Sequence, residues 1–345
     1  MNVDLLSGIA LIAVGAFASG SFSMPFEKVK GWKWENHWLV YSLFAYVVVP
    51  LLSCLVFCPD FLSVLSVCPP GLLGRIFLLG VLYGICNLTF GLSLKYLGVS
   101  LGFIISLGLM MVLGTVIPPV LDGRIAGMFG GAGGVMLVWG LSIGIIGVLV
   151  SAYAGYKKDT QSGNGQEPTL NFRKGILLAL FVGLTGASQA LGIEQGNGIS
   201  RILLERGVDE LFVMLPTVTV LFAGSFLITL IWCVWVGYKN GSLKLFAGTG
   251  AGKLIPNYLF CALSGFLWFL NMITYGMGKS FMGEYSFTAW GILMSQLLYL
   301  EPHNNQKQSE ISKRKSLITN TFYKLTLFGC FLSLPKFPHI FDTYF

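Results

Sequence analysis

Uninterrupted apolar stretches of about twenty residues recur along this chain, and they constrain its fold more than any other feature. A bilayer core about 30 Å thick is crossed by about 20 apolar residues in an α-helix. Nine ranges meet this requirement: Leu5–Met24, Trp38–Phe57, Ile76–Leu94, Leu101–Leu121, Val135–Tyr156, Gly175–Ile193, Leu211–Val236, Tyr258–Met277 and Tyr285–Leu300. A tenth, Leu317–Leu334, is weaker, because a cation such as Lys324 near its centre costs about 2.5–3.5 kcal/mol on insertion.

The composition supports membrane helices and excludes an ordinary soluble domain. Apolar residues make up 54% of the chain, charged residues only 11%, and the mean hydropathy is +0.75. Soluble domains carry about 25% charged residues. Backbone groups in hydrocarbon must be paired within the segment, and these runs are too long and too uniformly apolar for barrel strands. The chain is therefore predicted to be an all-α, polytopic membrane protein.

The distribution of positive charge predicts the orientation of the helices. Connections after odd-numbered helices hold eleven Lys and Arg, and those after even-numbered helices hold five. The positive-inside rule then places the N-terminus outside a multi-pass protein. Asp4, with no Lys or Arg before the first apolar range, argues against a cleaved signal peptide. The net charge of +7 is thus a topology signal, and nucleic acid is not the expected partner.

Two stretches of the sequence match when the chain is shifted by 184 residues. The shift superposes Asn87 on Asn271, Lys95 on Lys279, Phe103 on Phe287 and Leu109-Met110 on Leu293-Met294. The shift spans five helices, and an odd number of helices inverts the orientation. Two inverted five-helix halves form a transporter architecture with its substrate near the midplane. The expected division is 1–156 and 175–300 for the halves, 157–174 for a cytoplasmic linker and 301–345 for a divergent tail.

Polar and aromatic side chains inside two of these helices predict a sugar site. Asn87 and Asn271 occupy equivalent positions of the repeat, and Trp268 and Tyr275 share a helical face with Asn271. Amides and phenols bind sugar hydroxyls, while an aromatic plane covers the C–H face. The alternative for each amide is a hydrogen bond that only joins two helices, and this is the favoured interpretation of Gln189.

Acidic residues at membrane depth are candidate proton carriers. Glu35 before the second helix and Glu194 at the end of the sixth are the candidates here. Neither lies at a helix centre, so a solvated interfacial carboxylate is the competing interpretation of both.

No motif in the sequence predicts a metal, a cofactor or an enzyme site. The seven cysteines show no paired metal spacing, and all three histidines fall outside the predicted helices. The run Gly248–Lys253 fails as a phosphate loop, because Ala247 and Leu254 stand where glycine and Ser or Thr are needed. We therefore expect no cofactor and no ATP-driven pump.

The segment Pro25-Phe26-Glu27-Lys28-Val29-Lys30-Gly31-Trp32-Lys33-Trp34-Glu35 with Trp38 resembles the bacterial L-rhamnose/proton symporter family of the drug/metabolite transporter superfamily. The likeness continues through Asn87, Gly91-Leu92, Tyr96-Leu97-Gly98, Ser100, Gly102, Gly114-Thr115 and Pro119, then Leu215-Pro216, Trp268, Tyr275, Gly278, Tyr285 and Trp290. The resemblance implies ten helices in inverted halves, the bacterial inner membrane and uptake of L-rhamnose with a proton.

Three departures from the family pattern qualify the resemblance. Glu194 does not match a family position, which favours Glu35 for coupling, and Ser286 stands where some members are expected to be acidic. After about residue 295 the likeness stops, and Glu301–Lys307 interrupts the apolar run. We therefore predict a shifted reading frame from about residue 295.

The sequence thus predicts a secondary transporter that imports L-rhamnose with a proton by alternating access. Asn87, Trp268, Asn271 and Tyr275 are the expected sugar ligands, and Glu35 and Glu194 are the proton-coupling candidates. The alternatives are a superfamily transporter of another sugar or metabolite, and a membrane sugar sensor or enzyme that moves nothing.

Overall fold

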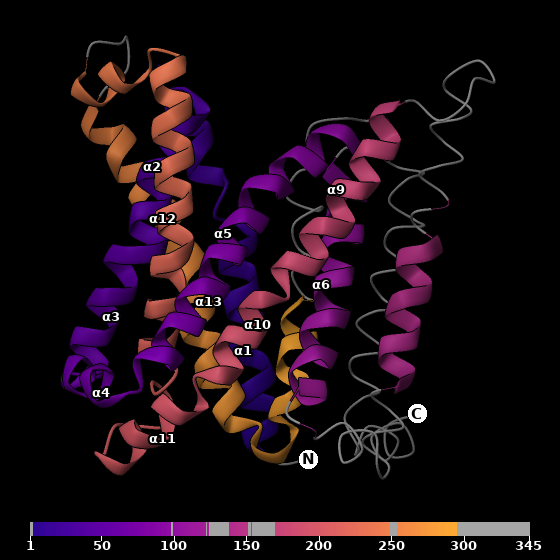
Figure 1. Cartoon of the computed structure of the whole chain (residues 1–345), viewed down its shortest axis with the longest axis vertical. Coiled ribbons are helices and arrows are strands. Elements are labelled where there is room, and N and C mark those ends of the chain that lie inside the picture. Colours follow the sequence, from indigo (N-terminus) through magenta and orange to yellow (C-terminus); the bar gives the residue numbers. More distant parts are fainter. Residues whose placement is uncertain are drawn as a thin grey trace. The chain divides into compact units, whose positions relative to one another are not determined.

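A computed structural model describes residues 3–97, 99–121, 123, 138–150, 153, 170–248 and 254–294, and every regular element within these ranges is a helix (Figure 1). Within these ranges, seven stretches are long and apolar enough to cross a membrane: Asp4–Lys28, Trp34–Phe57, Pro70–Ser93, Ile104–Leu121, Phe172–Glu205, Leu215–Lys239 and Leu254–Phe281. The prediction of an all-α polytopic membrane protein is confirmed. The ten-helix inverted repeat stays a prediction.

The elements follow one another as short and long helices. They are α1 (Val3–Gly20), η1 (Met24–Lys28), α2 (Trp34–Leu43), η2 (Phe44–Val48), α3 (Val49–Phe57), α4 (Phe61–Val67), α5 (Pro70–Leu97), α6 (Val99–Leu121), α9 (Leu170–Gly186), α10 (Ser188–Gln195), α11 (Asn197–Glu205), α12 (Leu215–Lys239), η3 (Leu243–Ala247), α13 (Leu254–Phe281) and η4 (Gly283–Thr288). A further apolar helix covers Val138–Val150.

The chain divides into two compact units, which we describe separately. One comprises Met1–Ile9, Cys86–Leu191 and Phe281–Phe345, and the other comprises Ala10–Ile85 and Gly192–Ser280. The predicted repeat halves are a different division of the chain and remain untested. The predicted tail, 301–345, lies outside the described residues.

In the first unit, α6 packs closely on α9. A methyl group on Gly183 would lie 2.6 Å from Cβ of Leu109, so only glycine fits at this crossing. The indole N–H of Trp290 donates to the carbonyl of Met110 at 3.4 Å, which ties the helical turn after η4 to α6. Trp290 and Met110 are both buried in the core of this unit.

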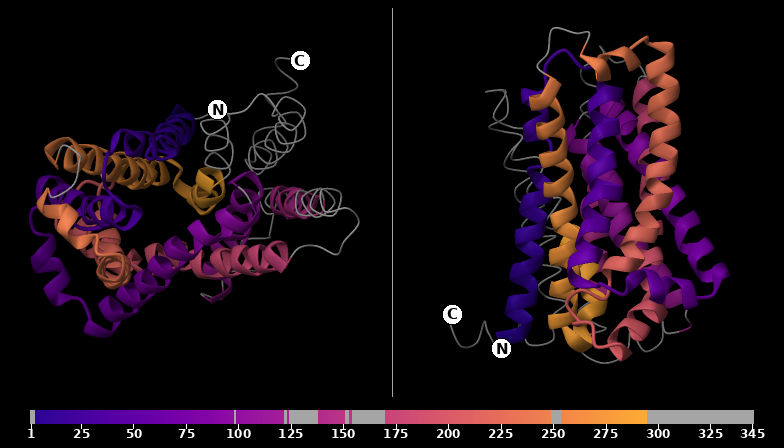
Figure 2. Two further views of the ribbon diagram at one scale, coloured as in Figure 1. Left: turned by 90° about the horizontal axis from the view of Figure 1, so that it is seen from above. Right: turned by 90° about the vertical axis from the view of Figure 1, so that its left-hand side faces the viewer.

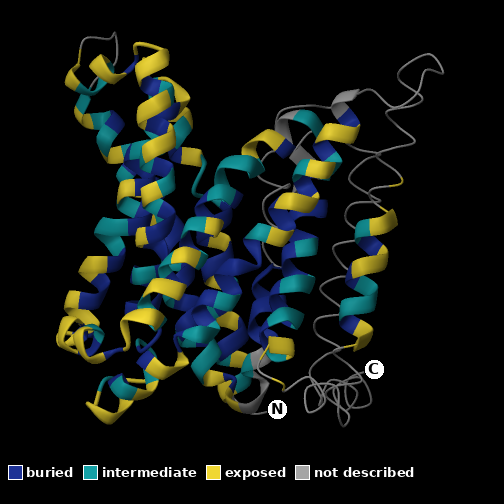
Figure 3. Cartoon of the chain, viewed as in Figure 1, coloured by how far each residue is buried: buried dark blue, intermediate teal, exposed yellow. Residues whose placement is uncertain are grey.

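In the second unit, the first half of α12 lies in the core. Nearly every residue from 215 to 225 is buried, whereas the second half of the helix is largely exposed (Figure 3). Gly80 and Gly84 on α5 meet the backbone of α12 directly, and a methyl group on Gly84 would lie 2.8 Å from the carbonyl oxygen of Ser225. Small residues that let two backbones approach are typical of membrane helix pairs.

The second predicted helix is interrupted by a π-helical turn, η2. Pro50 follows this turn and has no N–H to donate to the carbonyl four residues before it, which favours a local change of helix type. Gly265 on α13 lies against the same segment, and a methyl group there would be 2.8 Å from the backbone nitrogen of Ala45. Apolar periodicity carries no signal for such a turn.

Several predicted boundaries are wrong, each for a local reason. Helix α12 begins at Leu215 rather than Leu211, with Pro216 in its first turn, where proline is tolerated. Tyr285 lies in the 3₁₀ turn η4 rather than at an α-helix start. The two short helices α4 and α11 were not predicted, because they are too short to give an apolar run. Leu317–Leu334 falls outside the described residues.

Candidate functional site

One face of α13 carries three of the predicted sugar ligands. Trp268, Asn271 and Tyr275 are all buried, and their spacing of three and four residues places them one above another on the helix. The predicted common face is therefore present within the second unit.

Trp268 lies in a cluster of aromatic rings contributed by three helical segments. The ring of Tyr46 from η2 meets it edge-to-face, with centroids 5.1 Å apart and planes at 80°. Phe222 from α12 lies 5.1 Å away at 55°. The sequence analysis missed Tyr46 and Phe222, because their proximity to Trp268 depends on how α2 and α12 pack and leaves no pattern in the sequence.

Asn271 is 3% exposed, and its side-chain carbonyl oxygen Oδ1 has no hydrogen-bond partner among the described residues. Helix α1 runs alongside α13 at this level (Figure 2), and a methyl group on Gly15 would be 3.2 Å from that oxygen. Because Gly15 has no side chain, the Asn271 amide faces the backbone of α1. A buried polar atom without a partner costs about 1–3 kcal/mol, so Asn271 requires an explanation beyond packing.

Asn87 lies on α5 in the other unit and is half-buried. Gln189 on α10 is 2% exposed and belongs to the same unit as Asn87.

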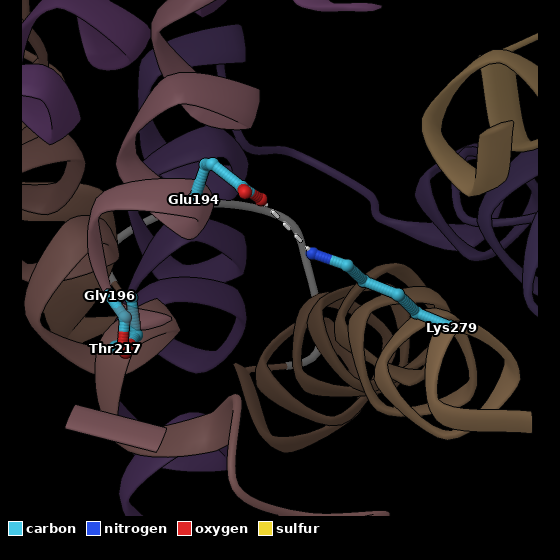
Figure 4. A network of polar contacts seen from close by, with 4 residues as sticks. All are labelled: Glu194, Gly196, Thr217 and Lys279. Carbon is cyan, nitrogen blue, oxygen red and sulfur yellow. Dashed lines mark hydrogen bonds and ion pairs between the residues drawn. The ribbon is translucent and has the colours of Figure 1, made fainter. Parts of the chain in front are cut away.

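Glu194, at the end of α10, forms an ion pair with Lys279 near the end of α13 (Figure 4). The carboxylate and ammonium groups are 3.3 Å apart, and the two side chains are 23% and 24% exposed. Lys279 lies one turn after Tyr275 on α13. The pair is thus partly shielded from water and close to the predicted sugar ligands of α13.

The backbone beside Glu194 is held by α12. The hydroxyl of Thr217 donates to the carbonyl of Gly196 at 3.4 Å, and a methyl group on Gly196 would be 2.6 Å from Cβ of Thr217 (Figure 4). This contact fixes the junction between α10 and α11, which orients Glu194 toward Lys279.

Glu35 has a different environment, in which one carboxylate oxygen, Oε1, accepts from two side-chain donors. It is 5% exposed and accepts hydrogen bonds from the Ser242 hydroxyl at 2.6 Å and the Asn240 amide at 2.9 Å. Gly241, with φ of +61°, makes the tight turn after α12 that presents both donors. The nearby Asn36 amide donates to the Ser242 carbonyl at 3.0 Å, so these residues together join the start of α2 to the end of α12.

Within the described ranges, no group of three or more His, Cys, Asp or Glu residues is arranged to hold a metal ion. Six cysteines in these ranges are buried free thiols.

Comparison with known proteins places these features in a family context. The family model of the L-rhamnose-proton symport protein (RhaT) matches residues 1–301. The L-rhamnose-proton symporters of Yersinia pestis (strain Pestoides F) and of Pectobacterium carotovorum subsp. carotovorum (strain PC1) are each 31% identical to this chain over 298 residues, which cover 86% of the chain and 86% of each relative. No solved structure matches significantly. The family match ends at residue 301, a few residues beyond the position where the sequence predicts that the resemblance stops.

Proposed function

We propose that this chain, which belongs to the L-rhamnose-proton symport protein family, imports L-rhamnose together with a proton. The observation that carries the proposal is the family match over residues 1–301, which includes all the predicted site residues. The relatives of Yersinia and Pectobacterium, named as L-rhamnose-proton symporters, support the same substrate and the same coupling ion.

Transport by alternating access in the bacterial inner membrane fits the helical architecture. We place the N-terminus outside on the positive-inside rule and propose two inverted five-helix halves. A proton that enters down the membrane potential supplies about 2.3 kcal/mol per 100 mV, which supports substantial sugar accumulation.

The sugar is proposed to bind on the buried face of α13, while Asn87 of α5 stays a proposed sugar ligand on the sequence argument alone. The Trp268 ring would cover the C–H face of the sugar, and the Asn271 amide and Tyr275 phenol would bind its hydroxyls. The unpartnered carbonyl oxygen of Asn271 supports this assignment, because a sugar hydroxyl donates the hydrogen bond that the oxygen lacks.

For proton coupling, the geometry favours Glu194 over Glu35. Two short hydrogen bonds stabilise the ionised form of Glu35 and tie it into the contact between α2 and α12. Glu194 has Lys279 as its counter-ion at 3.3 Å, so protonation of Glu194 removes an attraction between α10 and α13. A proton carrier must couple its charge to helix contacts in this way, and we assign Glu35 a structural role.

Counterflow of labelled L-rhamnose in proteoliposomes, with and without an imposed pH gradient, tests the proposed function. Wild-type protein is expected to exchange the sugar without a gradient and to accumulate it when the outside is acidic. Uptake indifferent to the gradient would refute symport. Exchange of another sugar or metabolite but not L-rhamnose would favour the alternative transporter, and binding without exchange would favour a sensor.

Glu194→Gln separates coupling from binding. The variant is expected to retain sugar counterflow but to lose accumulation driven by the pH gradient, because glutamine carries no titratable proton. Glu205→Gln, at the exposed end of α11, is the matched control and should accumulate sugar as wild type does. Normal gradient-driven accumulation by Glu194→Gln would remove Glu194 from the coupling step.

A further inference from the structure

We infer that Ser264 is a second hydroxyl-binding residue of the sugar site, so that the monosaccharide lies along α13 between Ser264 and Asn271 and over Trp268. The inference rests on the proposed function and adds a ligand that neither the sequence motifs nor the repeat indicated.

The first observation is that Ser264 is completely buried without a hydrogen-bond partner. Its exposed fraction is 0%, and among the described residues its hydroxyl oxygen Oγ makes no hydrogen bond. A buried hydroxyl in this situation forfeits its hydration and gains nothing in return. Such groups in folded proteins require a specific explanation, of which a missing ligand is one.

The second observation is that other buried hydroxyls in the helices of this unit do find a partner. Several donate to the backbone carbonyl four residues earlier: Ser53 to Val49, Thr219 to Leu215, Thr229 to Ser225 and Thr274 to Leu270, at 2.8, 2.9, 2.9 and 3.1 Å. The same bond is available in principle to Ser264, whose position four residues earlier is Phe260 in the same helix. Ser264 does not use it, so its hydroxyl is directed elsewhere.

The third observation is the register of Ser264 on α13. It precedes Trp268 by four residues and Asn271 by seven, so all three share one helical face. Seven residues of α-helix rise about 10.5 Å. This rise is long enough for a six-membered sugar ring to lie along the helix between the two side chains.

The two unpartnered atoms complement each other chemically. Asn271 Oδ1 only accepts a hydrogen bond, whereas the Ser264 hydroxyl both donates and accepts. One sugar hydroxyl donating to Asn271 and another bonded to Ser264 would fix the ring across the indole of Trp268. Two fixed hydroxyls and one covered face distinguish one hexose from its epimers, so Ser264 is proposed to determine specificity.

Ser264→Ala tests the inference, with Ser53→Ala as the matched control. Both substitutions remove one buried hydroxyl of the same size, but the hydroxyl of Ser53 is bonded to its own helix at 2.8 Å. In proteoliposome counterflow, Ser264→Ala should raise the KM for L-rhamnose about 3- to 10-fold, the range expected for one neutral hydrogen bond. Ser53→Ala should leave the KM unchanged.

Monodeoxy-L-rhamnoses identify the hydroxyl that Ser264 binds. One of them should compete with L-rhamnose less well than the others against wild type, and that deficit should vanish in Ser264→Ala. Thermal unfolding without sugar provides a second readout. Ser264→Ala should melt no lower than wild type, because the lost hydroxyl had no partner, whereas Ser53→Ala should melt lower.

Each outcome has a definite meaning for the two proposals. If wild type exchanges L-rhamnose but Ser264→Ala has an unchanged KM, or weakens every deoxysugar equally, the inference about Ser264 is wrong and the proposed function stands. If wild type exchanges no L-rhamnose, both are overturned.

Discussion

The crossing of α5 and α12 leads to a quantitative prediction about Gly80. Added to Gly80, a methyl group would overlap the carbonyl oxygen of Leu221. The obstruction is backbone, which cannot rotate away as the end of a side chain can. Gly80 also accepts a hydrogen bond at its carbonyl from the Ser225 hydroxyl at 2.8 Å. Gly80→Ala must therefore separate the two helices and stretch or break that bond.

The expected cost follows from three contributions to the free energy of unfolding. Overpacking a well-packed contact costs about 1–3 kcal/mol. A hydrogen bond between membrane helices contributes about 0.6 kcal/mol on average. Alanine is a better helix former than glycine by about 1 kcal/mol in water, which acts in the opposite direction. Gly80→Ala should therefore destabilise the protein by about 1–3 kcal/mol, when these ranges are combined.

Gly74→Ala, six residues earlier on the same helix, is the matched control. A methyl group on Gly74 would meet nothing within 4 Å. The difference between the two variants cancels the helix-propensity contribution and should be about 2–4 kcal/mol. Ser225→Ala isolates the hydrogen bond and should cost about 0.6 kcal/mol.

Unfolding by SDS in mixed micelles, followed by circular dichroism, measures these differences. The reasoning fails if Gly80→Ala and Gly74→Ala unfold within about 0.5 kcal/mol of each other, the limit for independent surface substitutions. That result would mean that the helices separate at little cost.

Three further predictions concern other parts of the chain. Ser242→Ala removes the hydroxyl that donates to Glu35 at 2.6 Å and should lower the free energy of unfolding by about 1.5–3 kcal/mol in the same SDS titration. Ser66→Ala, at an exposed site, is the control and should not lower it in this way. Burial raises the pKa of the Cys58 thiol to about 11, so the reactive thiolate is scarce at pH 7. Maleimide labelling of Cys58 in detergent, measured by peptide mass spectrometry, should be slow at pH 7 and become about tenfold faster per pH unit. Rapid labelling of the folded protein at pH 7 would contradict this. Translating the gene downstream of codon 294 in the other two frames should yield an apolar continuation, and the tail is genuine divergence if neither frame does.

Apolar run length predicted most of the membrane helices, because a span needs only hydrophobicity and length. Seven of the predicted ranges appear as long apolar helices. The shorter apolar helix Val138–Val150 lies inside another predicted range, Val135–Tyr156. The π-helical turn at Phe44–Val48 and the short helices α4 and α11 escaped prediction. Turns of this kind arise from hydrogen bonding around Pro50 and from contacts with other helices, neither of which changes the hydropathy of the sequence.

The face of α13 was predictable because helical spacing alone brings Trp268, Asn271 and Tyr275 together. The partners that these and other residues find on different helices could not be predicted in this way. The pairing of Glu194 with Lys279 joins residues 85 positions apart, and that of Glu35 with Ser242 joins residues 207 apart. A single sequence carries no record of such pairs, so a solvated interfacial carboxylate competed as the interpretation of both residues, although the structure gives each a protein partner.

The direct contact between the backbones of α5 and α12 has a consequence for the surrounding bilayer. With Gly80 and Gly84 against the carbonyls of Leu221 and Ser225, no space remains for an acyl chain to wedge between the two helices. The contact between α5 and α12 should therefore not change with lipid chain length or unsaturation. Adaptation to a thinner or thicker bilayer has to occur elsewhere in the protein.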